Sequence, residues 1–468
     1  MQKSWFRNNN LFMNLKTVVI GSGLSSLSFV DKFLEKNDSI DLISPDFEFL
    51  NKEEFFPNKH IYNDLPHQIY SYMDKINHYF HFNKISVDKN AKVLGSLEFG
   101  GLSNYWGCQM DQNFIDDLIG YNKKSKNEII NSFFEILKKF KLLGSFSHKK
   151  RKYENDYKVD SFFEKLLKKK FKDLVTIKPM LAYSNNTKLI PKNYYEKFLK
   201  KRKIKIHNYF VERIIYENNG VILKCRNQSE LKTFYAKKVI LGCGTLATTK
   251  LLMEFLKIKE EVRIKHHPRL VSVFFSKFKI KNIFTSASSQ LHLRSKKKSN
   301  SFVVDFRSGN KTIIESATKL KKYLIPFKII LSLFKNFIIF SNILLDSNHS
   351  NLFMKMQTNG KINIYSKPKN TTDVLKKIHK KIFNILRNEK MILPLSKNFF
   401  PGYGNDFHYF GTLTNNKKKK LSINQNCQLK GYKNIYVIDG SVFDFKVNKY
   451  PLGVIMANAR RIAKKINK

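Results

Sequence analysis

The chain is poor in cysteine and has no long apolar run, and each shortage excludes a class of protein. Its 468 residues contain four cysteines, none of them in a C-x-x-C pair. His266 and His267 are adjacent and His292 follows in the same region, but no metal-ligand spacing emerges. A disulfide framework and a metal module are therefore excluded, and a reducing compartment is expected. No uncharged apolar run reaches the roughly 18 residues of a membrane-spanning helix.

Acidic residues are also scarce, since 37 Asp and Glu face 86 Lys and Arg and give a formal net charge of +49. Lysine supplies nearly all of this charge and is spread along the chain without an arginine-rich arm. We therefore expect a solvated lysine coat and no nucleic-acid partner, with peripheral contact to an anionic membrane as the alternative.

The first residues do not read as a secretory signal. Lys3 and Arg7 are followed by Asn8–Asn10 and then by a strand pattern. We expect a cytoplasmic protein, with association on the cytoplasmic side of a membrane as the variant.

One segment, residues 323–345, is very apolar and is interrupted by Lys328, Lys335 and Asn342 at seven-residue spacing. This repeat places the polar residues on one stripe of a helix. The pattern predicts a long helix, which either packs on a core or lies on a membrane surface.

The most informative feature is a glycine turn between a strand and a helix. Residues 17–20 form a β-branched run, Gly21 and Gly23 follow, and an amphipathic pattern extends over 24–34. Gly21 permits a tight turn, and the missing Cβ of Gly23 lets backbone approach a pyrophosphate at the helix N-terminus. Ser26 is small enough for close packing of helix and strand. The pattern predicts a dinucleotide site.

Three units of strand plus glycine recur, at residues 17–27, 239–245 and 435–441. They predict an α/β fold in which one Rossmann-like parallel-sheet domain, built from discontinuous segments, binds the nucleotide. The inserts predict an α+β substrate-binding domain with an antiparallel sheet. The expected nucleotide-binding parts are 15–120, 201–258 and 425–468; the expected inserts are a cap at 121–200 and the substrate-binding domain at 259–424. A strand at 40–43 precedes Asp46, which either holds the ribose or serves as a turn residue after Pro45.

Four segments taken in order resemble the glucose–methanol–choline family of flavin-dependent alcohol oxidoreductases. They are VVIGSGLSSLS (residues 18–28), GGLSNYWGC (100–108), AKKVILGCGTLATTKLL (236–252), and a C-terminal set comprising HYFGT (408–412), NCQLKGYKNIYVIDGSVF (426–443) and YPLGVIMANARRIA (450–463). The middle of the chain shows no resemblance.

The resemblance implies an FAD cofactor, two domains and oxidation of a CH–OH group in a sugar, polyol or other alcohol. The electron acceptor is not indicated. The implied cofactor-binding residues are Gly21, Gly23, Leu24, Ser25, Ser26, Asp46, Gly101, Ser103, Asn104, Val211, Gly242, Gly244, Asp439, Gly440 and Pro451. Asp439 has the alternative role of capping the turn that follows it, and Trp106 is a flavin contact or a core residue.

The resemblance also implies that His408 accepts the hydroxyl proton, because an imidazole with a pKa near 6.5 is a suitable base at cellular pH. Where the family has a second His or Asn, this chain has Tyr450, and Asn448 is the substitute if the loop is shifted. A tyrosine hydroxyl can bind a substrate oxygen, but it is a poor base at neutral pH. This departure leaves open an FAD-dependent non-oxidative reaction on a sugar. The net charge and the apolar segment 323–345 leave open a basic peripheral membrane protein with a vestigial flavin fold.

Overall fold

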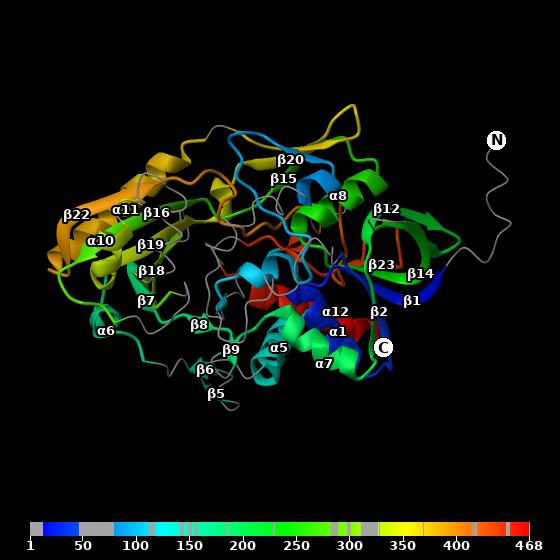
Figure 1. The fold of residues 1–468 in the computed structure, drawn as a ribbon, viewed down its shortest axis with the longest axis horizontal. Helices are drawn as coiled ribbons and strands as arrows, with labels where there is room; N and C mark the ends of the chain where they lie inside the picture. The colour runs from blue at the N-terminus through cyan, green and yellow to red at the C-terminus, as the bar shows by residue number, and fades with distance from the viewer. Residues whose placement is uncertain are drawn as a thin grey trace.

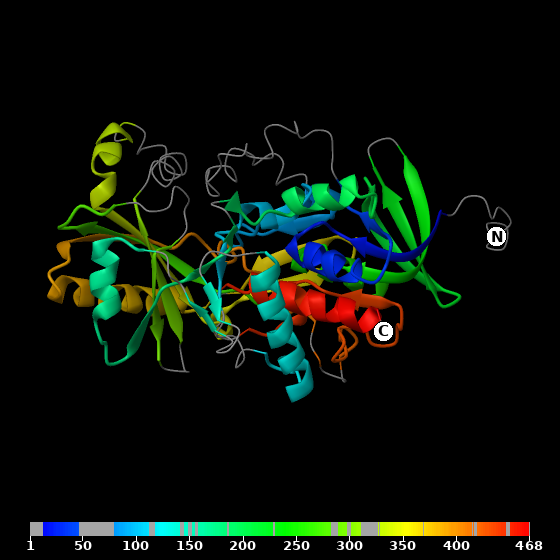
Figure 2. The same ribbon diagram turned by 90° about the horizontal axis from the view of Figure 1, so that it is seen from below.

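The protein is described by a computed structural model. It covers residues 13–45, 79–111, 118–140, 145–147, 152–154, 158–184, 187–227, 230–281, 289–296, 301–309, 326, 328–367, 369–413, 415, 419–445 and 450–467. The fold is mixed α/β, with parallel and antiparallel sheets. The two largest sheets lie at opposite ends of an elongated molecule (Figures 1 and 2).

A seven-stranded sheet occupies one end. Its main order is β11 (Ile204–His207), β2 (Ile40–Ile43), β1 (Met13–Ile20), β14 (Leu231–Leu241), β13 (Gly220–Arg226) and β12 (Phe210–Glu217), and β23 (Ile435–Val437) also pairs with β14. Strands β11, β2, β1, β14 and β23 run parallel, whereas β14, β13 and β12 form an antiparallel meander. Parallel strands end at the same sheet edge, so their glycine turns meet there.

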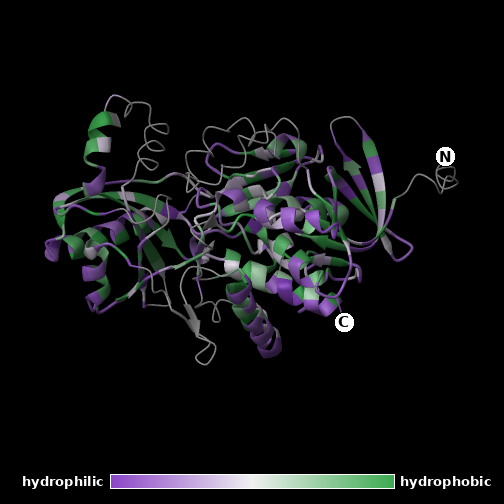
Figure 3. Cartoon of the chain, turned by 60° about the horizontal axis from the view of Figure 1, so that its bottom comes forward, coloured by the Kyte–Doolittle hydropathy of each residue, from purple (hydrophilic) through white to green (hydrophobic). Residues whose placement is uncertain are grey.

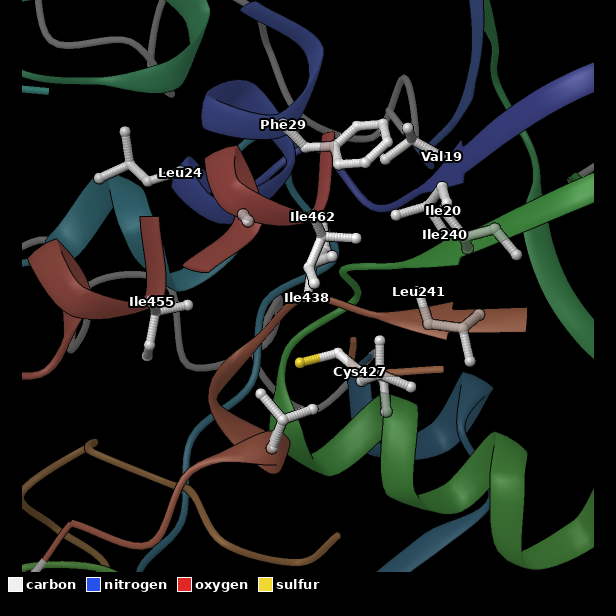
Figure 4. Packing of buried hydrophobic residues seen from close by; sticks show 14 of the residues in the cluster. Val19, Ile20, Leu24, Phe29, Ile240, Leu241, Cys427, Ile438, Ile455 and Ile462 are labelled. Carbon is white, nitrogen blue, oxygen red and sulfur yellow. The ribbon is translucent and has the colours of Figure 1, made fainter. Parts of the chain in front are cut away.

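Helices α1 (Leu24–Phe33), α12 (Leu452–Ile466) and α5 (Lys123–Lys139) pack together beside this sheet. Ser28 Oγ of α1 donates a hydrogen bond of 2.8 Å to the backbone oxygen of Met456 in α12. Small side chains allow this close approach. Figure 4 shows Phe29 beside Val19 of β1, and both belong to one buried apolar cluster. The remaining helices of this region are α7 (Pro191–Lys200) and α8 (Thr245–Phe255).

A six-stranded antiparallel sheet forms the other end. Its order is β22 (Ile392–Phe399), β16 (Arg269–Ser276), β19 (Ile338–Leu345), β18 (Phe302–Ser308), β17 (Leu291–Ser295) and β7 (Leu174–Ile177). One face packs against α11 (Thr371–Asn388) and α6 (Ser161–Lys168) in a second apolar cluster. The opposite face contributes to the candidate site.

Smaller elements connect the two ends. A four-stranded sheet has the order β15 (Val262–Ile264), β20 (Leu352–Met356), β21 (Ile362–Ser366) and β3 (Ile85–Val87). Three two-stranded ribbons pair β4 (Gln109–Met110) with β8 (Met180–Leu181), β5 (Ser145–Ser147) with β6 (Lys152–Glu154), and β9 (Tyr183–Ser184) with β10 (Thr187–Lys188). Short 3₁₀ turns are η1 (Gly101–Tyr105), η4 (Lys335–Phe337), η5 (Ser347–His349) and η6 (Gly440–Val442).

The local elements predicted around the glycine turns are confirmed. Strand β1, helix α1 and strand β2 follow one another as expected, and α8 follows β14. The hairpin between β12 and β13 turns at Asn218 and Asn219, whose φ angles are 49° and 60°. Asparagine tolerates this left-handed conformation, which a two-residue hairpin turn requires.

The long helix expected over 323–345 is wrong for the described residues. Helix α10 (Lys328–Leu333) is short, and the chain then passes through η4 into strand β19. Residues of β19 are rich in Ile and Leu and pair on both sides with β16 and β18. This pairing overrides the helical spacing of the polar residues. Figure 3 shows α10 as a largely hydrophobic helix standing out from the body, and its Ile329 and Leu333 are exposed.

Within the described parts of the chain, no helix combines the length and the apolarity needed to cross a bilayer.

Candidate functional site

A cleft of about 220 Å³ lies where the parallel strands of the seven-stranded sheet end. It receives the turns after β1, β2, β14 and β23. Ten predicted cofactor residues line it: Gly21, Gly23, Ser25, Gly101, Ser103, Val211, Gly242, Gly244, Asp439 and Gly440. Asp46 and Asn448 lie outside the described residues.

The turn after β1 is held in a conformation that requires glycine. Gly21 has φ of +95°, and a Cβ added there would lie 2.6 Å from the carbonyl oxygen of Gly242. Ser22 Oγ shares a hydrogen bond of 2.7 Å with Ser44 Oγ, and the N–H of Gly100 donates to Ser22 Oγ at 2.7 Å. Three segments distant in sequence are thus fixed around one hydroxyl. Sequence reasoning missed Ser22; its only signal was its place between two turn glycines.

Several predicted cofactor residues support the cleft without lining it. The N–H of Leu24 donates to Ser103 Oγ at 3.1 Å. Ser26 is fully buried, and its Oγ donates to the Gly242 carbonyl at 3.5 Å, as close packing of helix and strand requires. Asn104 Nδ2 donates to the backbone oxygen of Phe99 at 2.9 Å. These three residues shape the turns that surround the cleft.

Pro451 and Trp106, two further predicted cofactor contacts, pack within the protein and do not line the cleft. Pro451 is buried and precedes the first residue of α12, while its neighbour Leu452 lines the cleft. Trp106 Nε1 donates to the backbone oxygen of Leu189 at 2.9 Å, and its ring packs against the large apolar cluster. Trp106 therefore occupies the position of a core residue.

Asp439 lies two residues after the end of β23, lines the cleft and caps the turn that follows. Its carboxylate accepts hydrogen bonds from the N–H and Oγ of Ser441 and from Thr248 Oγ1. Burial raises the pKa of Asp439 above its usual value, although these donors oppose the rise. Both roles considered for this residue are therefore compatible with its surroundings.

His408 does not itself line the cleft, but the residues on either side of it, Phe407 and Tyr409, do. The Nδ1 atom of His408 faces a carboxylate oxygen of Asp406 at 3.9 Å. Burial lowers the pKa of His408 and Asp406 partly offsets this, so the pKa stays below its usual value of 6.5. The imidazole is therefore neutral at pH 7. The separation of 3.9 Å is too long for a hydrogen bond, so Asp406 acts on the imidazole through its charge, which favours a proton on Nδ1 and leaves Nε2 as the acceptor.

Asp406 is held by more than one histidine. Its carboxylate lies 2.8 Å from His266 Nδ1 and accepts from the N–H of His267 at 2.8 Å. Burial alone would raise its pKa, but His266 and the neighbouring histidines lower the pKa to about 2. Asp406 therefore carries a negative charge behind His408 throughout the neutral range. Sequence reasoning noted His266 only as a histidine without metal spacing, and it missed Asp406, which stands two residues before the predicted base.

Tyr450 approaches His408 from a different segment. The two rings meet edge to face with their centres 6.1 Å apart, and the ring of Tyr450 also stacks on His292 with the centres 5.0 Å apart. The hydroxyl of Tyr450 donates to Asp305 Oδ2 at 3.1 Å. Burial and Asp305 raise the pKa of Tyr450 well above its usual value, so this hydroxyl is a donor and not a base. The structure thus brings together His408 and Tyr450.

Asp305 was also missed, although a lone acid inside the apolar strand sequence FVVDFRS is an unusual pattern. It is buried and accepts from Arg307 at 2.8 Å and from the N–H of Asn342 at 2.9 Å. Burial opposes ionisation, but Arg307 and Asn342 prevail and lower the pKa of Asp305. The site therefore holds two ionised carboxylates: Asp406 beside His408, and Asp305 hydrogen-bonded to Tyr450.

No protein-family model matches the chain, and no curated protein sequence matches it significantly.

Proposed function

We propose that the protein is an FAD-dependent oxidoreductase that oxidises a CH–OH group to a carbonyl. The observation that carries this proposal is the position of His408. A neutral imidazole, backed by the Asp406 carboxylate, lies beside a glycine-lined cleft at the carboxyl ends of parallel strands. A nucleotide cleft and a proton acceptor side by side are the two parts that flavin-dependent alcohol oxidation needs.

The residues of the cleft fit a dinucleotide. The turn after β1 leads into α1, whose first turn contains no acidic residue to compete with a phosphate. Gly440 lines the cleft and has to be glycine, because an added Cβ would lie 2.8 Å from the backbone oxygen of Tyr409 and push the two segments apart. Gly21, Gly23 and Ser25 would hold the pyrophosphate, and Val211 would border the adenine. Bound FAD would supply the acceptor for the hydride.

The protein residues would then handle the proton. The substrate hydroxyl would face Nε2 of His408, which takes its proton as the carbinol carbon gives up a hydride. Asp406 would stabilise the resulting imidazolium, because its pKa of about 2 keeps it ionised. The hydrogen bond from the Tyr450 hydroxyl to Asp305 would hold the Tyr450 ring in place beside His408. The alcohol loses one hydride and one proton, and the product is a carbonyl.

The cofactor proposal is tested by replacing Gly21 with alanine. A Cβ there collides with Gly242 at a φ of +95°, so the turn must shift, and we expect the affinity for FAD to fall at least about 100-fold. The matched control is Gly360→Ala, which also has positive φ, of +76°, but has no atom within 4 Å of the added Cβ. Absorbance of bound flavin after dialysis measures both.

Two results would contradict the cofactor proposal. One is a wild-type protein that takes up no flavin even after reconstitution with FAD. The other is a Gly21→Ala protein that stays folded by circular dichroism and keeps wild-type affinity for FAD.

The proton proposal makes a prediction for pH. Because the pKa of His408 lies below 6.5, kcat/KM should be flat near neutrality and should fall only in acid, as the imidazole becomes protonated. Asp406 raises the pKa of His408, so Asp406→Asn should move this acid limb to still lower pH and reduce the plateau. Anaerobic flavin reduction over about pH 4 to 8 measures the profile. Asp373→Asn, at an exposed position on α11, is the control and should keep the wild-type profile. An acid limb that moves to higher pH in Asp406→Asn would refute the assignment of His408 as the proton acceptor.

A further inference from the structure

The two faces of the six-stranded sheet differ in chemistry. The face toward α11 and α6 is part of a closed apolar core, with residues such as Leu270, Phe274 and Ile343 fully buried. The residues that alternate with them point to the other face, which we call the site-side face. It is defined by cross-strand partners, because directly opposed residues in antiparallel strands share a face.

One row of partners crosses the whole site-side face. From β7 to β22 it reads Ile177, His292, Asp305, Asn342, Val271 and Phe399. A neighbouring row reads Arg307, Phe340, Val273 and Lys397. The first row is polar over β17, β18 and β19 and apolar over β16 and β22. The second row is charged at Arg307 on β18, apolar over β19 and β16, and charged again at Lys397 on the edge strand.

The polar half belongs to the candidate site. Asp305 accepts from Tyr450, and His292 stacks on the same ring. Arg269 is also on this face. Its guanidinium lies 5.3 Å from the ring centre of Phe407, the residue before His408. The site-side face thus begins at His408 and Tyr450 and continues away from them.

The apolar half has a graded exposure that a core would not show. Asp305 and His292 are buried, Val271, Val273 and Phe340 are half-buried, and Phe399 is 40% exposed at the edge. Leu395 of β22 is 52% exposed. An apolar surface of this kind gains free energy when a ligand covers it.

We propose that the substrate is an amphipathic alcohol, with its hydroxyl at His408 and an apolar tail along Val271, Val273, Phe340 and Phe399. The inference rests on the proposed function, because it names the substrate class of the same site. The polar head group would lie against Asp305, His292 and Tyr450, where donors and acceptors are available. A small, fully polar sugar would leave the apolar rows uncovered.

The experiment measures binding and oxidation separately. The probes are alkyl β-D-glucosides from methyl to octyl, used below their micellar concentrations, and equilibrium dialysis against the protein supplemented with FAD gives their affinities. Since the tail would be covered on one side only, we expect affinity to rise about 2-fold per methylene, or about 16-fold from butyl to octyl. Anaerobic bleaching of the flavin is recorded for the same compounds.

Variants locate the tail. Phe340→Ser and Phe399→Ser should each flatten the dependence on chain length, and the exposed position of Phe399 makes its variant tolerant of the change. Leu231→Ser, at a residue 75% exposed on β14, is the control and should keep the wild-type slope. Affinities independent of chain length, or a wild-type slope in both phenylalanine variants, would overturn the inference. If affinity rises with chain length in the wild type and not in those variants, but no compound bleaches the flavin, the result would support the tail site and overturn the proposed oxidation.

Discussion

Replacing His408 with alanine is expected to lower kcat/KM by about 10²- to 10⁴-fold, the range that a positioned general base contributes. The substrate hydroxyl would lose its proton acceptor, while the cleft that borders Phe407 and Tyr409 keeps its lining. FAD should therefore remain bound. Anaerobic flavin reduction measures the rate, and the visible spectrum after dialysis measures the bound cofactor.

Two additions sharpen this test. External imidazole should restore part of the activity of His408→Ala, because it can enter the space of the lost ring and accept the proton. His349→Ala, at a histidine in η5 that does not line the cleft, should keep wild-type turnover. Full turnover in His408→Ala would remove His408 from the proposed mechanism.

Replacing Arg460 with methionine is expected to lower the free energy of unfolding by about 3–5 kcal/mol. Arg460 is buried and belongs to α12. Its guanidinium lies 2.6 Å from Asp31 and 3.0 Å from each of Glu35 and Glu135, so it joins α12 to α1 and to α5. Methionine fills much of the volume but leaves the buried carboxylate of Asp31 with only the half-exposed Lys139, 3.3 Å away, as a cation partner. Urea unfolding measures the change.

Lys169→Met is the control for this prediction, because Lys169 makes one ion pair, with Glu389, and is half exposed. Such a surface pair contributes about 1 kcal/mol or less. Combining Arg460→Met with Asp31→Leu should recover part of the loss, since it removes the buried carboxylate that has lost its buried partner. A loss in Arg460→Met no larger than that of the control would show that the cluster does not stabilise the helix packing.

Local chemistry made the cleft side of the molecule predictable. The turn at Gly21 and Gly23 and the strand ending at Asp439 are each encoded within about a dozen residues, so sequence reasoning could find them. The surroundings of His408 are not local. Asp305 is placed by strand β18 of the six-stranded sheet, and His266 by the pairing of Lys265 with Phe410. Both residues lie more than a hundred positions from His408 in the sequence, so no short window contains these pairings.

The error at residues 328–345 has the same cause. The seven-residue spacing of Lys328, Lys335 and Asn342 satisfies a helix when the segment is considered alone. In the structure, Asn342 instead donates its backbone N–H to Asp305 on the neighbouring strand. Pairing with β16 and β18 is decided by residues elsewhere in the chain, and it outweighs the local preference.

The packing of α1 against α12 has a consequence for synthesis on the ribosome. About 420 residues separate the end of α1 from the start of α12. At 5–20 residues per second, the first strand–helix unit emerges roughly 20 to 80 seconds before its partner helix exists. During that interval the apolar side of α1 faces water or a chaperone. The cleft can therefore close only after nearly the whole chain has been made, and we expect FAD to be captured after translation and not during it.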